Sequence, residues 1–237
     1  MTRLAGAPMT RLAGAHMTHL VIGAAGHAQE VAWSLRAMLG GDLELLFFDD
    51  RVAPGPLASG LGSVVGPLDR VAAYARTNAR LVLGIALPRL KASVVAQLAP
   101  LGLPWVTVVH PTATIGPNVE LGDGSYVAAG AIVTVNVRAG RFTTINMHCQ
   151  AAHDAVLADL VTLHPGARLA GGVTVGEGVE LGTAAVVLPG ATIGPWAVLG
   201  AGTIALRSLP GGRTYVGVPA RPVRQRGRAV RLDQGAA

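Results

Sequence analysis

A chain of 237 residues has room for one or two domains and a substantial core. Although 51% of the residues are hydrophobic, no run of eighteen apolar, uncharged residues occurs, so we expect a soluble protein without membrane insertion. The formal net charge of +6 comes with few aromatic residues and no nucleic-acid-binding motif, which predicts no nucleic-acid partner.

The chain begins with a tandem repeat, in which MTRLAGAP is followed by MTRLAGAH. The apolar pieces of this repeat are too short for the core of a signal peptide. We therefore expect residues 1–16 to be an extended or duplicated, disordered start, and the folded protein to begin near Met17.

Residues 17–105 alternate between two kinds of pattern. Short apolar runs predict strands at residues 19–23, 43–48 and 80–85, and helical spacing predicts helices at residues 28–39, 68–76 and 88–98. The stretch before Gly66 is rich in proline and glycine, which predicts a loop. The alternation predicts a small Rossmann-like parallel α/β domain.

Glycine and acidic residues follow the first two predicted strands. The turn Gly23-Ala-Ala-Gly26-His27 opens the first predicted helix, where backbone N–H groups can hold a phosphate. Asp49 and Asp50 end the second strand, where an acid reaches a ribose or base in nucleotide-binding α/β folds. A plain tight turn is the alternative, but together the two features favour a nucleotide ligand.

A period of six dominates residues 106–206. Every sixth residue is aliphatic, namely Val109, Ile115, Leu121, Val127, Val133, Ala139, Ile145, Ala151, Leu157, Leu163, Leu169, Val175, Leu181, Val187, Ile193 and Leu199. This period predicts a solenoid of short parallel strands, with eighteen residues in each coil and coils about 4.8 Å apart. Glycines such as Gly116 and Gly122 follow the aliphatic position, and we expect them at corners because their backbone torsions are unrestricted.

His153-Asp154 interrupts a repeat made otherwise of small and apolar residues. A histidine beside a carboxylate can act as a general base, although a surface histidine with a chance acidic neighbour gives the same spacing. Cys149 is the only cysteine, which excludes an intrachain disulfide and is typical of a cytoplasmic protein. We expect it to be a small buried apolar residue rather than a nucleophile.

The end of the chain, residues 207–237, predicts a loop with the motif Gly217-Val-Pro-Ala220 and a basic tail. Its positive charges are arginines, at positions Arg207, Arg213, Arg221, Arg224, Arg226, Arg228 and Arg231. They favour anionic ligands such as nucleotides or coenzyme A, and a solvated basic tail is the alternative.

Four blocks of the chain together resemble one family. They are residues 21–27 (VIGAAGH), 47–50 (FFDD), 146–154 (NMHCQAAHD) and 215–220 (YVGVPA). In order and spacing they resemble the hexapeptide-repeat sugar acyltransferases that include sialic-acid O-acetyltransferases and UDP-4-aminosugar N-acetyltransferases. The resemblance implies a left-handed β-helix, a homotrimer with active sites between subunits, acetyl-CoA as co-substrate and no metal.

The resemblance also implies roles for single residues. His153 matches the catalytic base and Asp154 the acid that raises its basicity. The residues that match substrate-binding positions are Ala25, Gly26, His27, Asp49, Asp50 and Asn146. The residues at or near acetyl-CoA-binding positions are Thr162, His164, Gly171, Thr183 and Ala201. Two positions depart from the family pattern: Ala152 stands where an acid or polar residue is common, and Thr162 where a histidine is common.

The function expected from the resemblance is transfer of an acetyl group from acetyl-CoA to a sugar, with a nucleotide-linked 4-amino-deoxysugar favoured as acceptor. A sialic acid O-acetyltransferase is the alternative. A zinc enzyme like the γ-carbonic anhydrases is a more remote one, because His148 and His153 have the spacing of two of its ligands but Thr112 replaces the third. A catalytically silent scaffold on the same fold is a further alternative.

Overall fold

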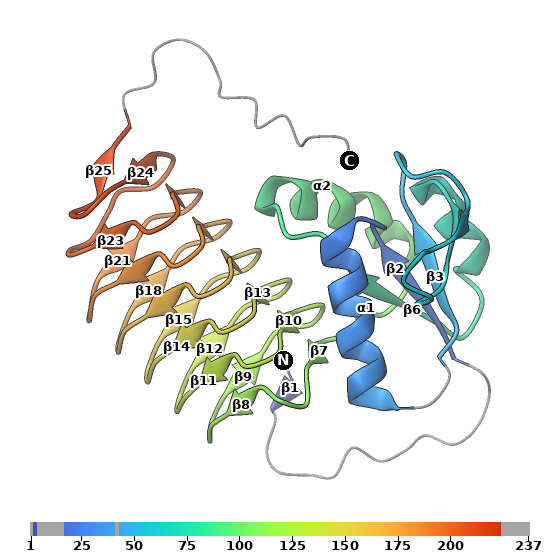
Figure 1. Cartoon of the computed structure of the whole chain (residues 1–237), viewed down its shortest axis with the longest axis horizontal. Coiled ribbons are helices and arrows are strands. Elements are labelled where there is room, and N and C mark those ends of the chain that lie inside the picture. The colour runs from blue at the N-terminus through green and yellow to red at the C-terminus, as the bar shows by residue number, and fades with distance from the viewer. Residues whose placement is uncertain (1, 4–16, 41–42, 224–237) are drawn as a thin grey trace.

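The computed structural model describes residues 2–3, 17–40 and 43–223. Figure 1 shows an α/β domain beside a prism of stacked coils, with helices α1 and α2 on the side of the domain that faces the prism. Within these residues, no helix has the length and apolar character that crossing a membrane requires.

The α/β domain contains a five-stranded sheet in the order β4-β5-β3-β2-β6. Its strands are β2 (Thr18–Ile22), β3 (Leu45–Phe48), β4 (Gly55–Pro56), β5 (Ser63–Gly66) and β6 (Ala79–Leu83). Strands β5, β3, β2 and β6 are parallel, whereas β4 forms an antiparallel edge. The sequence predicted a loop where β4 and β5 lie, and this is wrong: proline and glycine are accommodated in short strands at the sheet edge.

Helices cover both faces of this sheet. Helix α1 (Gly26–Leu39) packs against one face, and the 3-10 helix η1 (Leu68–Tyr74) and helix α2 (Pro88–Leu98) pack against the other. A short 3-10 turn, η2 (Ala99–Leu101), follows α2. The helices predicted in the first and third places are confirmed, and the second is a 3-10 helix.

The prism consists of two-residue parallel strands that follow one another every six residues and form three sheets. The first sheet contains β7 (Val108–Val109), β10 (Tyr126–Val127), β13 (Thr144–Ile145), β16 (Thr162–Leu163), β19 (Glu180–Leu181) and β22 (Val198–Leu199). The second contains β8 (Thr114–Ile115), β11 (Ile132–Val133), β14 (Gln150–Ala151), β17 (Arg168–Leu169), β20 (Val186–Val187) and β23 (Ile204–Ala205). The third contains β9 (Glu120–Leu121), β12 (Arg138–Ala139), β15 (Val156–Leu157), β18 (Thr174–Val175) and β21 (Thr192–Ile193).

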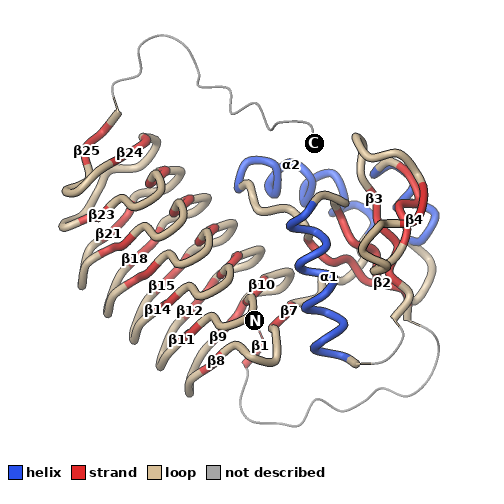
Figure 2. Tube along the Cα trace, viewed as in Figure 1, coloured by secondary structure: helices blue, strands red, loops and turns tan. Residues whose placement is uncertain are grey.

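The predicted period and register are confirmed. Residues eighteen apart pair in every sheet, as Val127 does with Ile145, and the aliphatic member of almost every strand is buried in one continuous core. The architecture is a left-handed parallel β-helix behind a Rossmann-like domain. Figure 2 shows how short each strand is compared with the turns that join the strands.

The predicted role of the corner glycines is wrong. The backbone is left-handed three residues after the aliphatic position, as at Asn118 and Asp154 with φ of 56° and 62°, and not at Gly116 or Gly122. A Cβ at Gly122 would lie 2.4 Å from the backbone nitrogen of Arg141 on the next coil. Close approach of successive coils, rather than an unusual torsion, therefore requires glycine at that position.

Further strands lie at the two ends of the chain. Strand β24 (Thr214–Val216) pairs with β22 and with β25 (Arg221–Pro222), so the region predicted as a loop extends the first sheet. Strand β1 (Thr2–Arg3) pairs antiparallel with β9. The expectation of disorder therefore does not hold for these two residues. The rest of the repeat at the start, and the basic tail after residue 223, lie outside the described residues.

The α/β domain covers part of the first sheet. The outward-facing residues of β7, β10, β13 and β16 are buried, whereas Glu180 and Val198 further along the sheet are partly exposed. We call the buried part, formed by Val108, Tyr126, Thr144 and Thr162, the covered face. It fixes the domain against the first coils of the prism.

Candidate active site

His153 and Asp154 lie at a corner between the second and third sheets, which we call the His153 corner. His153 Nδ1 is 2.8 Å from Asp154 Oδ2, and the two side chains are 64% and 56% exposed. The hydrogen bond from His153, followed by one from Asn136, lowers the pKa of Asp154. An ionised carboxylate accepts from Nδ1–H, so the lone pair of Nε2 is available to take a proton.

Gly171 forms the floor under the imidazole of His153. A Cβ at Gly171 would lie 2.4 Å from both Cε1 and Nε2 of His153. The backbone N–H of Gly172 donates to the carbonyl of His153 at 2.9 Å. The ring therefore rests on the next coil in a position that any side chain at residue 171 would occupy.

Asn136 was not singled out in the sequence analysis, although it contacts this pair. Its Nδ2 donates to Asp154 Oδ1 at 3.0 Å, from the same corner one coil earlier. A groove of about 500 Å³ runs beside it along the third sheet and is lined by Asn118, Glu120, Asn136, Arg138, Asp154 and Val156. The eighteen-residue spacing between Asn136 and Asp154 was the available signal in the sequence.

The predicted nucleotide turn lies where β2 and β3 end. Asp49 accepts hydrogen bonds from the backbone N–H of Ala24 and of Arg51, both at 2.8 Å, so its carboxylate joins the two turns. Asp50 Oδ1 accepts from the N–H of Leu68 at 2.9 Å and thereby fixes the start of η1. Both carboxylates thus shape the loop, and the exposed side chain of Asp50 also faces solvent.

Ala25, Gly26 and His27 complete this turn at the start of α1. Ala25 and Gly26 are exposed, and His27 is partly buried. The edge of the His27 ring meets Tyr126 of the covered face with ring centroids 5.7 Å apart. The structure therefore brings the predicted nucleotide residues together and places them against the first sheet of the prism.

The remaining predicted residues lie at the corner between the first and second sheets, which we call the His164 corner. Asn146 is 5% exposed and its Oδ1 accepts from the N–H of Met147 at 2.7 Å. His164 Nε2 is 2.8 Å from Glu180 Oε1. Thr183 and Ala201 are exposed at equivalent positions of successive coils.

Thr162 does not face a ligand-accessible surface. It belongs to the covered face, has no exposed area, and its hydroxyl donates to the carbonyl of Ala86 at 2.5 Å. The expectation of an acetyl-CoA contact at Thr162 is therefore corrected, because the segment that precedes α2 covers this side chain.

The predicted residues thus form two groups within one chain. His153, Asp154 and Gly171 occupy the His153 corner, whereas Asn146, His164, Thr183 and Ala201 occupy the His164 corner. One side of the triangular coil separates the two corners. Met147 packs in the same apolar cluster as Ala24 and Ala28, so the nucleotide turn belongs with the His164 corner.

The residues that the structure describes within one chain offer no reactive cysteine and no metal site. Burial raises the pKa of Cys149 to about 12, so this thiol stays protonated, in agreement with its predicted role as a buried apolar residue. Among the described residues, no cluster of three or more His, Cys, Asp or Glu side chains is placed to hold a metal ion.

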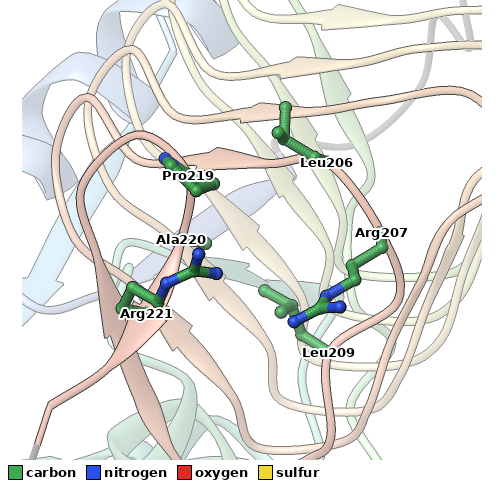
Figure 3. Close-up of a pocket in the computed structure, with 6 residues that line it drawn as sticks. All are labelled: Leu206, Arg207, Leu209, Pro219, Ala220 and Arg221. Carbon is green, nitrogen blue, oxygen red and sulfur yellow. The ribbon is translucent and has the colours of Figure 1, made fainter.

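A pocket of about 230 Å³ lies near the end of the prism (Figure 3). Figure 3 shows the side chains of Arg207 and Arg221 on its two sides, with Leu206 and Leu209 near Arg207 and with Pro219 and Ala220 near Arg221. Arg207 follows His153 by fifty-four residues, which is three coils, so it lies on the His153 corner about 14 Å further along the prism. The pocket is therefore suited to an anionic part of an extended ligand.

Comparison with known proteins identifies relatives that extend over most of the chain. A perosamine N-acetyltransferase from Caulobacter crescentus, solved in complex with CoA and GDP-perosamine, is 33% identical, with 87% of this chain and 97% of that chain covered and a TM-score of 0.79. The acetyltransferase domain of PglB from Neisseria gonorrhoeae is 29% identical, with 88% and 100% covered and a TM-score of 0.80. A GDP-perosamine N-acetyltransferase from Escherichia coli O157:H7 is 27% identical over 215 residues, 86% of this chain and 96% of the relative.

No protein-family model matches the chain. The stacked coils, the α/β domain and the His-Asp pair nevertheless define the class as a hexapeptide-repeat acyltransferase. On the extent of its similarity to the Caulobacter enzyme, the chain belongs to the hexapeptide-repeat sugar N-acetyltransferases. The predicted family, fold and enzyme class are confirmed.

Proposed function

We propose that the protein transfers the acetyl group of acetyl-CoA to the amino group of a nucleotide-linked 4-amino-deoxysugar, with His153 as general base. The observation that carries the proposal is the His153–Asp154 pair resting on Gly171 at an open corner of the prism. The relatives support the reaction class, because the Escherichia coli relative is a GDP-perosamine N-acetyltransferase and the Caulobacter enzyme was solved with CoA and GDP-perosamine.

The donor is acetyl-CoA. The acetyltransferase domain of the Neisseria protein was solved in complex with acetyl coenzyme A and is 30% identical to this chain. Arg207 and Arg221 line the pocket three coils beyond His153, where their positive charges suit a phosphate group of the donor. An extended donor lying along the corner would then place its thioester near Gly171.

The reaction proceeds by direct transfer. Nε2 of His153 accepts a proton from the amine as the amine nitrogen attacks the thioester carbonyl. The carbon–sulfur bond then breaks, and the CoA thiolate leaves and takes up the proton from the imidazolium. Asp154 stabilises the imidazolium while it exists, and the backbone N–H of Gly171 is suited to stabilise the oxyanion.

We infer that each site is shared by two chains of a homotrimer. The nucleotide turn belongs with the His164 corner, whereas the base lies on the His153 corner of the same chain. A sugar held by one chain therefore meets the His153 corner of a neighbouring chain. Co-expression of equal amounts of His153→Ala and Gly26→Leu chains tests this, because the randomly assembled trimers as a whole would regain about one quarter of the wild-type activity. A site built within one chain would regain none.

Replacement of the base tests the proposal directly. We expect His153→Ala to lower turnover of acetyl-CoA with GDP-perosamine by about 10²- to 10⁴-fold. The matched control is His148→Ala, which removes an exposed histidine five residues earlier and leaves turnover near the wild-type value. Wild-type turnover in His153→Ala would refute the role of the base, and equal losses in both variants would favour the zinc alternative.

Sialic acid O-acetylation remains the second candidate acceptor chemistry. A panel of nucleotide-linked 4-amino sugars, with free sialic acid included, distinguishes the two. The nucleotide turn favours the nucleotide-linked acceptor, since the free sugar offers nothing for Ala25, Gly26 and Asp50 to bind. Turnover of sialic acid alone would reverse the assignment.

A further inference from the structure

A row of polar side chains leads along the His153 corner to the catalytic pair. Asn118, Asn136 and Asp154 occupy the same position of three successive coils, with left-handed backbone at φ of 56°, 59° and 62°. The backbone N–H of Asn136 donates to the carbonyl of Pro117, and that of Asp154 to the carbonyl of Val135, both at 3.1 Å. These bonds hold the three corners in register.

The side chains of this row are hydrogen-bonded in one direction. Asn118 Nδ2 donates to Asn136 Oδ1 at 3.2 Å, and Asn136 Nδ2 donates to Asp154 Oδ1 at 3.0 Å. Asp154 accepts through its other oxygen, Oδ2, from His153 at 2.8 Å. Each amide thus presents its oxygen to one neighbour and its nitrogen to the next, and the row ends on the carboxylate that contacts the base.

The row of side chains stops at the level of the base. The next two positions are Gly172 and Gly190, where a Cβ would meet no atom within 4 Å. Asparagine tolerates left-handed backbone, so a corner role alone explains why asparagine is allowed. Glycine occupies the same kind of corner at other coils, so backbone geometry alone does not require two amides bonded toward Asp154.

We propose that Asn136 is a positioning residue that, held by Asn118, fixes the plane of the Asp154 carboxylate so that Oδ2 stays on His153 Nδ1. This rests on the proposed role of His153 as general base. Asp154 is more than half exposed, so without a second partner its carboxylate is free to rotate away from the imidazole. The amide of Asn136 supplies that partner on the opposite oxygen.

The charges around this row are few. Glu120 and Arg138 line the same groove from the third sheet, and His153 is the ion-pair partner of Asp154. Asn136 is uncharged and donates to the carboxylate, which agrees with its part in lowering the pKa of Asp154. An acid at position 136 would reverse this effect, because a second carboxylate would face Asp154 Oδ1 in place of a donor.

Two substitutions of Asn136 test the proposal. Asn136→Asp keeps the shape and the left-handed corner but replaces the donor by an acceptor, and Asn136→Gly removes the side chain without backbone strain. We expect kcat/KM to fall about 10-fold in each, with KM for acetyl-CoA unchanged. In Asn136→Asp the added negative charge stabilises the imidazolium, so the acidic limb of the pH profile moves upward by about half a unit.

Asn118→Gly is the graded comparison, because it removes only the support of Asn136. We expect a smaller loss of about 2-fold, because Asn136 keeps its own bond to Asp154 in this variant. Wild-type kcat/KM and pH profile in both Asn136 variants, with His153→Ala inactive, would overturn the positioning role alone. Full activity of His153→Ala would instead overturn the proposed function on which this inference rests.

Discussion

The His153 corner and the covered face are polar regions of one repeat with opposite environments. At the corner, His153 is 64% exposed and contacts Asp154. On the covered face, Lys91 of α2 has no exposed area, and its Nζ donates to the carbonyl of Phe142 at 2.9 Å and the hydroxyl of Thr144 at 2.8 Å. Both regions interrupt an apolar pattern, but only the corner leaves a polar atom accessible to a ligand.

The difference in exposure between these two regions decides whether a polar side chain of the prism is structural or accessible to a ligand. Outward positions of the strands become structural when another element covers them, as α2 covers Thr144 and the segment before α2 covers Thr162. Corner positions project beyond the sheets, and at His153 the glycine floor keeps the ring accessible. Burial lowers the pKa of Lys91 to about 7, and the negative charge of Glu180 opposes the shift. This amine therefore serves the packing of α2 on the prism and is not available to a ligand from solvent.

Among the substitutions that test the contrast between the two regions, filling the floor of the corner has the largest expected effect. Gly171→Ala would place a methyl group within 2.4 Å of the His153 ring, so the ring must move. A displaced base costs about 100-fold in kcat/KM, while the thermal midpoint stays near that of the wild type. Steady-state kinetics and thermal unfolding measure the two quantities.

Gly172→Ala is the matched control at the next residue. Its Cβ meets no atom within 4 Å, but its backbone is left-handed at φ of 65°. We expect it to lose about 1 kcal/mol of stability and to keep its activity. A fully active Gly171→Ala enzyme would contradict the role of the floor and weaken the contrast between the two regions.

The buried lysine gives the next largest effect. The folded-state pKa of Lys91 lies below its ordinary value of 10.5, so the unfolded chain binds the extra proton between about pH 7 and pH 10.5. The free energy of unfolding therefore rises with pH in that window and falls as the pH drops through about 7. Between pH 7 and pH 9 we expect a gain of about 2 kcal/mol for the wild type, measured by denaturant titration at constant protein concentration.

Lys91→Met removes the titrating group but keeps an unbranched side chain. The variant loses the hydrogen bonds to Phe142 and Thr144, so it is less stable at pH 9, and its stability no longer rises in this window. The same pH dependence in wild type and Lys91→Met would show that another group titrates. Catalysis per folded molecule should be unchanged, because Lys91 does not reach the His153 corner.

The smallest expected effect is at Thr162, where a substitution distinguishes a buried structural role from a contact with acetyl-CoA. Thr162→Val leaves the carbonyl of Ala86 without its hydroxyl donor and should cost about 1 kcal/mol of stability. The KM for acetyl-CoA should stay at the wild-type value. Thr174→Val, at an exposed outward position of the third sheet, is the control and should change neither quantity. A raised KM in Thr162→Val alone would place Thr162 in the donor site after all.

The sequence was sufficient for the features that depend on spacing. The period of six located the strands of the prism, and the adjacency of His153 and Asp154 in the chain made their contact predictable. The period could not show what covers each outward position, because that depends on how the α/β domain packs. For this reason Thr162 was expected near the donor, and nothing in the sequence indicated that Lys91 is buried.

Other features needed the three-dimensional register. Asn136 is one of several corner residues with left-handed backbone, and only its bond to Asp154 distinguishes it from Asn118 or Phe142. Strand β24 lies beyond the last aliphatic repeat, so its pairing with β22 left no periodic signal. Close approach between coils, which explains Gly122, is likewise invisible until the coils are stacked.

The triangular coil gives the protein two different units of length. For folding the unit is six residues, because each hexad places one aliphatic side chain in the same continuous core. For function the unit is eighteen, because only residues a whole coil apart share a corner. A deletion of one hexad between residues 110 and 146 would preserve the apolar pattern but turn His153 by one corner relative to the α/β domain. Folding is therefore compatible with a change of length by whole hexads, whereas catalysis requires a change by whole coils of eighteen residues.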